Sequence, residues 1–350
     1  MPLTKTAVAK ALAFCENNRT VCKILNFSPH VVTLKKGLKL AKIENMDTIA
    51  SIQEFTETTD LPSHTKVNDK TRKLSKAELD AFHAEYGFKI CPSLSEDERL
   101  QALELLHIYR SVFARDMTEI KAYNGQPLTI DLYSQHKCFR RQFKLSQEDQ
   151  LEADRQINAM EKNGIIEPSH NSFYNSPIFL VNKKNNQKRL VVDLRELNKL
   201  IIPKLVQLPH IEDLLQTITQ DNSQYISTLD LTVAYWSIGV SEESRDYLSF
   251  TGADGRCWRF AKCPFGLSSS PAALICALAQ LFSDRCRYQG ISVYMDDLAV
   301  FSRSIHDHLR QTELVLDMFK NANLSVNPHK TEIGFQEIEY LGYRISGTGI

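Results

Sequence analysis

Residues 291–302, ISVYMDDLAVFS, hold two adjacent aspartates between two apolar runs. Runs of this composition favour β-strands, so the stretch predicts a hairpin with Asp296 and Asp297 at its turn. A pair of aspartates in a turn is usually structural, because its carboxylates accept hydrogen bonds from nearby backbone N–H groups. At the edge of a packed sheet, however, the two charges repel each other, and a bound divalent cation would cancel that repulsion.

A second strand-like run, ISTLD, also ends in an aspartate, Asp230. If this run pairs with the hairpin, we expect the carboxylates of Asp230 and Asp296 to lie within about 6 Å of each other, close enough to share metal ions. Mg²⁺ prefers carboxylate oxygens and leaves coordination positions open for phosphates. These residues therefore indicate a metal site for phosphoryl transfer, in which positioning and charge neutralisation do most of the catalysis.

The overall charge does not identify a partner, because 42 basic residues balance 42 acidic ones in a chain of 350. Any attraction for nucleic acid must therefore be local. No apolar run approaches the roughly 20 residues that span a bilayer, so we expect no membrane segment. The eight cysteines lack the spacing of a zinc site, which favours free thiols in a reducing, intracellular compartment.

A local excess of positive charge lies between residues 175 and 205, where seven basic residues face two acidic ones. Lys183 and Arg189 flank the turn of a predicted hairpin there. Alone, this stretch is best explained as a solvated basic loop, but beside a carboxylate cluster it favours a basic hairpin that closes over a phosphate. Tyr235 follows Asp230 by five residues, and its spacing fits either a core aromatic or a substrate contact.

We expect four segments along the chain, which differ in polarity and in element type. Ser95 and Glu98 have the spacing of a capping box, so a helix is expected to begin there. Ser146 is a second expected helix start, and Gly164 is the expected end of that helix. The segments are a β-rich stretch over 1–45, a polar linker over 46–94, a helix with an irregular lead-in over 95–145, and a mixed region over 146–350.

The mixed region alternates helices with hairpins, which indicates an α+β fold rather than a doubly wound parallel sheet. We expect a small antiparallel sheet with helices on one face and the three aspartates together on the other. Strand pairs are expected within 176–194, 247–266, 291–302 and 338–346, a further strand over 224–230, and helices over 208–218, 271–282 and 306–321.

Residues from about 146 to 346 resemble the reverse transcriptases of long-terminal-repeat retrotransposons, most closely the gypsy-like group. The resemblance is carried by motifs in the family's order: RLVVDLRELNK, STLDLTVAYWSI, CPFGLSSSPAAL, YMDD, LSVNPHKTEIGF and EYLGYRIS. It implies the fingers and palm of a right-hand polymerase with an antiparallel palm sheet. The implied activity is that of an RNA-directed DNA polymerase, a nucleotidyltransferase that acts on an RNA or DNA template with a primer and on deoxynucleoside triphosphates.

The same resemblance implies roles for individual residues. Asp230, Asp296 and Asp297 would hold two Mg²⁺ ions, for which Mn²⁺ can substitute, and Asp296 would be the stricter ligand of the pair. Lys330 would be the acid that protonates pyrophosphate. The residues implied in substrate binding are Lys183 and Arg189 for the triphosphate, the Leu231 carbonyl beside the metals, Tyr235 as the gate against a ribose 2′-hydroxyl, and Phe265 with Gly266 beside the nucleotide and template.

The motifs for a thumb, an RNase H domain, an integrase and an aspartic protease are not found in this sequence, so we expect an internal piece of a polyprotein. Its first 45 residues resemble the β-rich segment that follows the protease in such polyproteins. The expected location is cytoplasmic, including virus-like particles. An inactive relic that keeps the fold and at most binds nucleic acid is the alternative. A metal-dependent nuclease is a third hypothesis, although such an enzyme would not need both Tyr235 and the basic hairpin.

Overall fold

The computed structural model divides the chain into two units, residues 1–71 and 72–350. In the first unit, β1 (Thr6–Val8) pairs antiparallel with β2 (Ile24–Asn26), within the stretch predicted to be β-rich. Lys183 lies outside the described residues. The structure describes residues 6–8, 24–26, 74–134, 136–170, 173–182, 187–204, 206, 208–220, 223–232, 234–282, 290–347 and 349.

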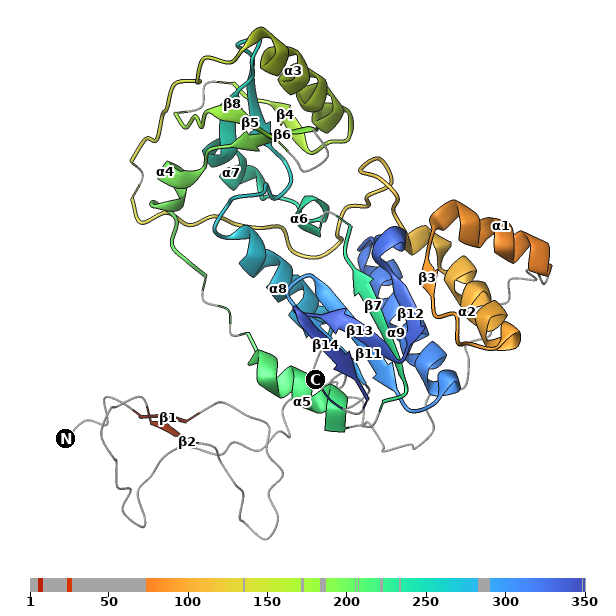
Figure 1. Ribbon diagram of the computed structural model, residues 1–350. Helices are drawn as coiled ribbons and strands as arrows, with labels where there is room; N and C mark the ends of the chain where they lie inside the picture. Colours follow the sequence, from red (N-terminus) through yellow and green to blue (C-terminus); the bar gives the residue numbers. More distant parts are fainter. Residues whose placement is uncertain are drawn as a thin grey trace, which may run out of the picture. The chain divides into compact units, whose positions relative to one another are not determined.

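A five-stranded sheet, which we call the palm sheet, forms the centre of the second unit (Figure 1). Four of its strands are antiparallel, and they include the predicted hairpin and the strand that ends at Asp230. The fifth strand runs parallel to its neighbour and comes from an earlier part of the chain. The order is β10 (Ile291–Tyr294), β11 (Asp297–Ser302), β7 (Tyr225–Asp230), β12 (Glu332–Phe335) and β3 (Lys89–Ile90).

Helix α9 (Ile305–Ala322) covers one face of the palm sheet, because its apolar side chains are buried against the sheet. A buried polar contact fixes this packing: His308 bonds to the hydroxyl groups of Ser227 at 2.6 Å and Ser302 at 3.0 Å. Burial lowers the pKa of His308 to about 4, so the ring is neutral near pH 7. The helix is thereby held to two neighbouring strands at once.

The other face of the palm sheet is only partly open. Ile226, Ala299 and Phe301 on this face pack against side chains of α5 (Ile211–Gln220) and of the hairpin β13 (Glu337–Tyr340)–β14 (Tyr343–Ser346). The prediction that helices lie on one face alone is therefore wrong, because α5 buries an apolar stripe against the second face. The end of this face that carries the aspartates is left uncovered by α5.

A second group of strands and helices forms the fingers, which precede and interrupt the palm in sequence. Helix α3 begins where the Ser146 hydroxyl accepts the Asp149 N–H, and it ends just before Gly164, which has a φ of 64°. Both ends were predicted from the sequence. The elements are α3 (Gln147–Lys162), β4 (Ile166–Pro168), the hairpin β5 (Ile178–Asn182)–β6 (Lys188–Val192), α4 (Arg195–Asn198), α7 (Glu242–Arg245), η2 (Asp246–Leu248), β8 (Ser249–Thr251) and β9 (Cys257–Phe260).

Two short helices connect the fingers to the palm. They are α6 (Ala234–Ser237), which directly follows β7, and α8 (Ser270–Leu281). The helix predicted over 271–282 is confirmed within one residue at each end. None of the helices within the described residues is long and apolar enough to cross a membrane.

The prediction of a polar linker over 46–94 is wrong for its second half. Helix α1 (Lys76–Tyr86) begins at a capping box in which Ser75 and Glu78 bond to each other's backbone N–H groups. Its inner side chains Leu79 and Phe82 are buried in the main core with those of α2 (Glu96–Ile108). The outer face of α1 is polar, so the polarity of the segment as a whole did not indicate the apolar positions on its inner face. The chain then adds β3 to the palm sheet and continues through η1 (Arg110–Val112).

Candidate active site

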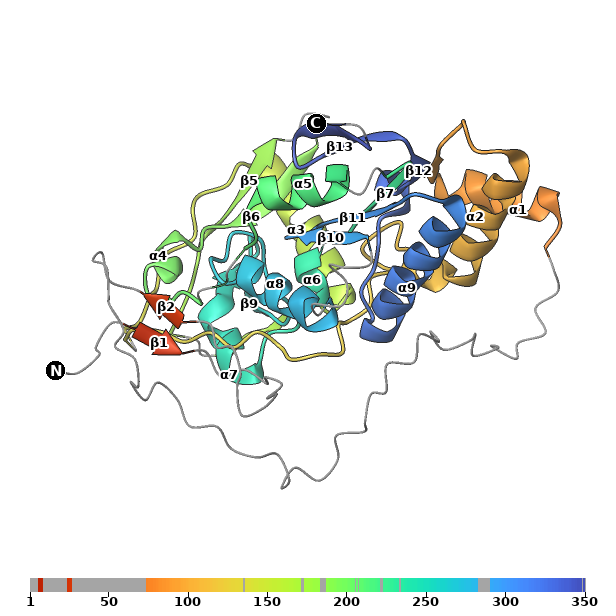
Figure 2. The same ribbon diagram turned by 90° about the horizontal axis from the view of Figure 1, so that it is seen from below.

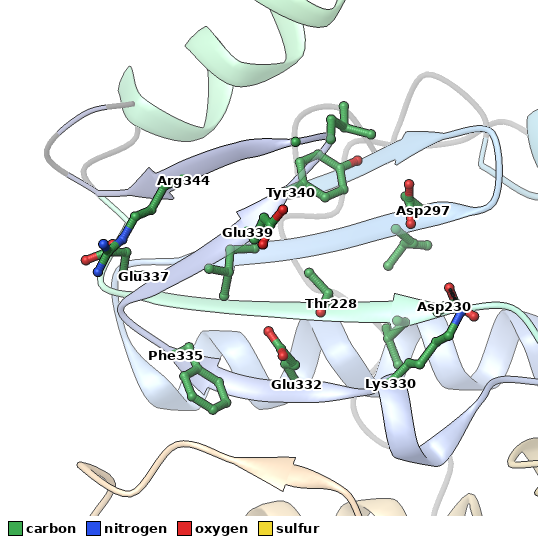
Figure 3. Close-up of a pocket in the computed structure, with 15 residues that line it drawn as sticks. Thr228, Asp230, Asp297, Lys330, Glu332, Phe335, Glu337, Glu339, Tyr340 and Arg344 are labelled. Atoms are coloured by element: carbon green, nitrogen blue, oxygen red, sulfur yellow. Dashed lines mark hydrogen bonds and ion pairs between the residues drawn. The ribbon is translucent and has the colours of Figure 1, made fainter. Parts of the chain in front are cut away.

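Asp230 and Asp297 are direct partners in adjacent antiparallel strands. Asp230 is the last residue of β7 and Asp297 is the first residue of β11, so both lie at the same end of the palm sheet. Cross-strand partners point to the same face, with Cβ atoms about 4.5–5.5 Å apart. Figure 3 shows both carboxylates on this face. The convergence of two of the three predicted ligands therefore follows from strand register alone.

Asp296 lies in the turn between the two strands of the hairpin. Because Tyr294 and Asp297 are paired, only Met295 and Asp296 remain to reverse the chain. Met295 has a φ of 55°, a left-handed conformation that costs a residue with a side chain about 1–2 kcal/mol. The turn is thus held tightly by the strands on either side, and it presents the exposed Asp296 carboxylate beside its neighbour.

The three aspartates influence one another electrostatically. Burial raises the pKa of Asp297, and the charges of Asp296 and Asp230 raise it further. Burial also raises the pKa of Asp230, where hydrogen bonding to Lys330 acts in the opposite direction and the charge of Asp296 adds to the rise. The sheet therefore holds carboxylates in a place where their negative charge is unfavourable unless a cation compensates it.

Lys330 supplies one such cation. It ends the short helix η4 (Pro328–Lys330), and its Nζ lies 3.0 Å from Oδ2 of Asp230 (Figure 3). The backbone N–H of Asn327, at the start of η4, donates to the Asp230 carbonyl at 2.8 Å. The sequence-based role of Lys330 thus has a geometric basis, since the lysine lies at the predicted metal site.

The donor set fits a divalent metal, but the side chains are not gathered around a common point. Within the described residues, no group of three Asp, Glu, His or Cys side chains is placed to hold a metal ion. Asp230 uses one carboxylate oxygen for Lys330 instead. Carboxylate oxygens at adjoining positions, with raised pKa values, are nevertheless the ligand chemistry that Mg²⁺ and Mn²⁺ prefer. The separation of about 6 Å expected between Asp230 and Asp296 stays a prediction.

The pairing of Leu231 sets the direction of its carbonyl. Leu231 pairs with Val326 in an isolated antiparallel bridge. The two flanking bonds run from Thr232 N–H to the Ser325 carbonyl and from Asn327 N–H to the Asp230 carbonyl, each 2.8 Å long. In this pattern the carbonyl of the central residue points away from its partner strand. Its orientation is compatible with the role that the family resemblance implies.

Tyr235, Phe265 and Arg189 form a cluster next to the carboxylates. The rings of Tyr235 and Phe265 meet edge to face at 5.5 Å, and the Arg189 guanidinium lies 4.2 Å from the centre of the Phe265 ring. Burial, followed by the charge of Asp296, raises the pKa of Tyr235, so its hydroxyl stays protonated at neutral pH. These three residues are far apart in the sequence, and they lie together between the fingers and the palm.

Gly266 has a φ of 83°, and the turn around it is fixed by Asn198, a residue that the sequence analysis missed. The Asn198 side chain donates to the Gly266 carbonyl at 2.8 Å and accepts the Ser268 N–H at 2.9 Å. Asn198 lies inside the RLVVDLRELNK motif, so the motif marked it, but no local pattern tells which turn a helical asparagine will hold.

Gln156 of α3 is a second residue that was missed. Its side chain donates to the Lys188 carbonyl at 2.8 Å and accepts the Leu190 N–H at 2.9 Å, on either side of Arg189. Lys188 itself pairs with Glu148 and Asp149 on the same helix. The helix therefore holds the strand that carries Arg189, while Arg189 stays exposed.

A cavity of about 1240 Å³ extends from the carboxylates along the palm sheet toward β13 and β14. Asp230, Asp297 and Lys330 line one part of it, and Glu337, Glu339 and Arg344 line another (Figure 3). Its walls therefore carry both signs of charge. The cavity is large enough for a polar chain to lie beside the aspartates.

Comparison with known proteins identifies this arrangement. A family model described as reverse transcriptase (RNA-dependent DNA polymerase) matches residues 181–345. A retrovirus-related Pol polyprotein from transposon 297 of Drosophila melanogaster is 29% identical over 266 residues, which cover 73% of this chain and 24% of that protein. The corresponding polyprotein from transposon opus of the same species is 35% identical over 204 residues, with coverage of 57% and 20%.

Solved structures give the same fold. A foamy viral protease-reverse transcriptase in complex with an RNA/DNA hybrid aligns with a TM-score of 0.67 and 24% identity, over 80% of this chain and 36% of that one. A mutant of the prototype foamy virus protease-reverse transcriptase aligns with a TM-score of 0.66 and 25% identity, over 77% and 35%. The chain spans about a fifth to a quarter of the length of the polyproteins it matches.

Proposed function

We propose that the reverse transcriptase domain formed by residues 181–345, which is related to those of gypsy-type retrotransposon Pol polyproteins, adds deoxynucleotides to a primer 3′-OH on an RNA template. One observation carries the proposal: strand register places Asp230 beside Asp297, with Asp296 next in the chain, at the end of the palm sheet. Three carboxylates in that position serve no evident structural need, because their charges repel.

Asp230, Asp296 and Asp297 are the residues that would hold two Mg²⁺ or Mn²⁺ ions. Such ions, when bound, supply an activated primer hydroxyl and neutralise charge on the leaving phosphate oxygen. Strands β7 and β11 contribute by fixing the backbone of Asp230 and Asp297 side by side before substrate arrives. This limits the reorganisation to the side chains, and such positioning is where a polymerase gains most of its rate.

The cluster next to the carboxylates is suited to bind a nucleoside triphosphate. Arg189 presents a guanidinium that can donate to phosphate oxygens, and Phe265 holds that guanidinium in place by stacking. Tyr235 has its ring fixed edge-on against Phe265, where it would stand beside the sugar and exclude a 2′-hydroxyl. Lys183 stays a predicted phosphate contact from the sequence, as does Gly266 beside the template.

Lys330 has two roles in this proposal. Before substrate binds, its ammonium offsets the negative charge of Asp230. If the carboxylates held metal instead, the Lys330 ammonium would be released from Asp230 and could donate a proton or a hydrogen bond to the leaving pyrophosphate.

A second candidate is a chain that binds nucleic acid without catalysing nucleotide addition. It is favoured by the Lys330–Asp230 ion pair, which occupies a predicted metal ligand. The structurally similar foamy viral enzymes are described in complex with double-stranded DNA and with an RNA/DNA hybrid, which supports a nucleic-acid partner under either proposal. The cytoplasmic location stays a prediction from the sequence.

Primer extension decides between the two candidates. The native chain is incubated with a DNA primer on an RNA template, all four deoxynucleoside triphosphates and Mg²⁺, beside the same reaction in EDTA and beside Asp296→Asn. Extension by the native chain alone, and only with Mg²⁺, supports the polymerase. Binding of the primer–template without extension by the native chain supports the second candidate and contradicts the first.

A further inference from the structure

The part of the chain before residue 115 holds β12, the strand that follows η4 and Lys330. β3 pairs with β12 so that Lys89 lies opposite Glu332. The Lys89 N–H donates to the Thr331 carbonyl at 3.0 Å, and the Cys91 N–H donates to the Ile333 carbonyl at 2.9 Å. The Lys89 ammonium adds an ion pair with Glu332 at 2.8 Å. The exit from η4 is therefore fixed by main-chain bonds to an element that lies outside the matched family domain.

The same part of the chain also holds the residues that lead into η4. Val326, just before η4, donates its N–H to the Val112 carbonyl at 2.9 Å, and its carbonyl accepts the Ala114 N–H at 3.0 Å. Ala114 reaches further, since its carbonyl accepts the Thr232 hydroxyl at 3.1 Å, two residues beyond Asp230. Both ends of η4 and the residues after Asp230 are thus tied to one neighbouring segment.

The two attachments belong to one packed body rather than to independent loops. Phe88, beside β3, and Phe113, beside Val326, are both buried and meet edge to face at 4.8 Å. Tyr86 stacks on Phe88 at 5.6 Å. Figure 1 shows α1, α2 and β3 together beside β12 and α9, and Figure 2 shows α1 and α2 beside α9. A shift at one attachment would therefore be transmitted to the other.

Gly87 lies against η4. It has a φ of 66° at the end of α1, and a Cβ built there would lie 2.7 Å from Nδ1 of His329, the residue before Lys330. A side chain at position 87 would thus have to displace His329. The left-handed backbone conformation favours glycine at this position, and any side chain there would also have to move the His329 ring.

We propose that residues 76–114 are a positioning element of the active site, which fixes η4 and thereby holds Lys330 against Asp230. The catalytic part of this inference rests on the proposed polymerase function. A three-residue 3₁₀-helix has little stability of its own, and the Lys330 side chain is 62% exposed, so its ion pair alone would hold it weakly. The bonds on both sides of η4 provide the constraint that the turn lacks.

Hydrogen exchange of the full chain tests the structural step without any catalysis. Gly87→Ala is compared with Gly164→Ala, which imposes the same left-handed strain, with a φ of 64°, where an added Cβ meets nothing within 4 Å. We expect the amides of residues 327–331 to exchange about tenfold faster in Gly87→Ala than in the native chain, and at the native rate in Gly164→Ala. Equal exchange in both variants would overturn the proposal.

A double-mutant cycle tests the catalytic step in single-nucleotide addition. Gly87→Ala should lower kcat about tenfold in the native background, with the KM for the triphosphate unchanged, and have little effect on kcat when Lys330→Ala is already present. Equal losses in both backgrounds would show that Gly87 does not act through Lys330. If the native chain adds no nucleotide at all, the proposed function fails, whereas the exchange result still decides whether residues 76–114 hold η4.

Discussion

In the palm, Asp230 and Asp297 are set by six consecutive residue pairs between β7 and β11, in a sheet with neighbours on both sides. In the fingers, Arg189 projects from a two-stranded hairpin with five pairs. A strand buried on both faces cannot slip by one residue without exposing its core side chains, so its register is firmly fixed. A two-stranded hairpin is only marginally stable without further packing, here supplied by Gln156.

This comparison indicates that the palm and the fingers are pre-organised for substrate to different degrees. The backbone of Asp230 and Asp297 is in place before any ligand binds, because strand pairing positions it, and only their side chains have to turn toward a metal. Arg189 is exposed and is held by its stacking on Phe265, an interaction of about 0.5–1 kcal/mol at an exposed site. We therefore expect substitutions in the palm to remove the reaction itself, and substitutions in the fingers to weaken the binding of the triphosphate.

The largest effect should come from the palm. Asp230→Asn removes a ligand charge that the sheet cannot replace, so the rate of nucleotide addition should fall by about 10³–10⁴-fold. Single-turnover incorporation measures it. Glu339→Gln is a matched control, because Glu339 lines the same cavity and is exposed. A loss of similar size in Glu339→Gln would mean that the effect is not specific to the aspartates.

Sugar selection should show the next largest effect, since Tyr235 lies where the two regions meet. Tyr235→Ala opens the space beside the sugar, so the preference for deoxynucleotides over ribonucleotides should fall about 100-fold. The ratio of kcat/KM for the two sugars measures this preference. Tyr235→Phe keeps the ring against Phe265 and should keep the preference. Unchanged selection in Tyr235→Ala would contradict a gating role.

A smaller effect is expected in the fingers. Arg189→Ala should raise the KM for the triphosphate about tenfold while kcat changes less, because the guanidinium binds phosphates in the ground state as well as in the transition state. Steady-state kinetics with a saturating primer–template measures both constants. Arg155→Ala, at an exposed arginine of α3 paired with Glu152, is the control. If Arg189→Ala lowered kcat as strongly as Asp230→Asn, the distinction between palm and fingers would fail.

The smallest effect concerns stability. The folded chain raises the pKa of Asp297, so the folded state binds protons more tightly there than the unfolded state. Stability from this group is therefore present at low pH and lost as the pH rises through the folded pKa. In EDTA at pH 7.5, Asp297→Asn should raise the free energy of unfolding by about 1 kcal/mol, and the gain should shrink toward pH 4. Urea unfolding beside Asp131→Asn, at an exposed carboxylate, measures it; a loss of stability would contradict the account.

Much of the palm could be predicted from the sequence, because its signals are local. The apolar runs around Asp296 and Asp297 specify a hairpin, and the strand ending at Asp230 has the same pattern. The capping box of α2, the N-cap of α3 and the glycine that follows α3 specify helix ends through contacts within a few residues. Such signals can be recognised in an isolated stretch of sequence. They therefore predicted the correct elements and the placement of the aspartates at one end of the sheet.

The features that were missed depend on contacts between distant residues. β3 has two residues, too few for any periodicity, and it becomes a strand only because β12 offers a free edge. Asn198 and Gln156 hold turns and strands that are 32 to 70 residues away in sequence. The family resemblance supplied Tyr235, Phe265 and Arg189 as separate residues, and the structure shows that three different elements bring them into contact.

The most direct test of the central claim is to count the metal ions that the palm carboxylates hold. The chain is assembled with a primer–template whose primer lacks the 3′-OH, a matching deoxynucleoside triphosphate and Mn²⁺, and bound Mn²⁺ is measured by electron paramagnetic resonance. The account predicts two bound ions per chain in the native complex, and loss of protein-dependent binding in Asp230→Asn. The same number of bound ions in both chains would show that the paired aspartates do not hold the metal, and would contradict the account.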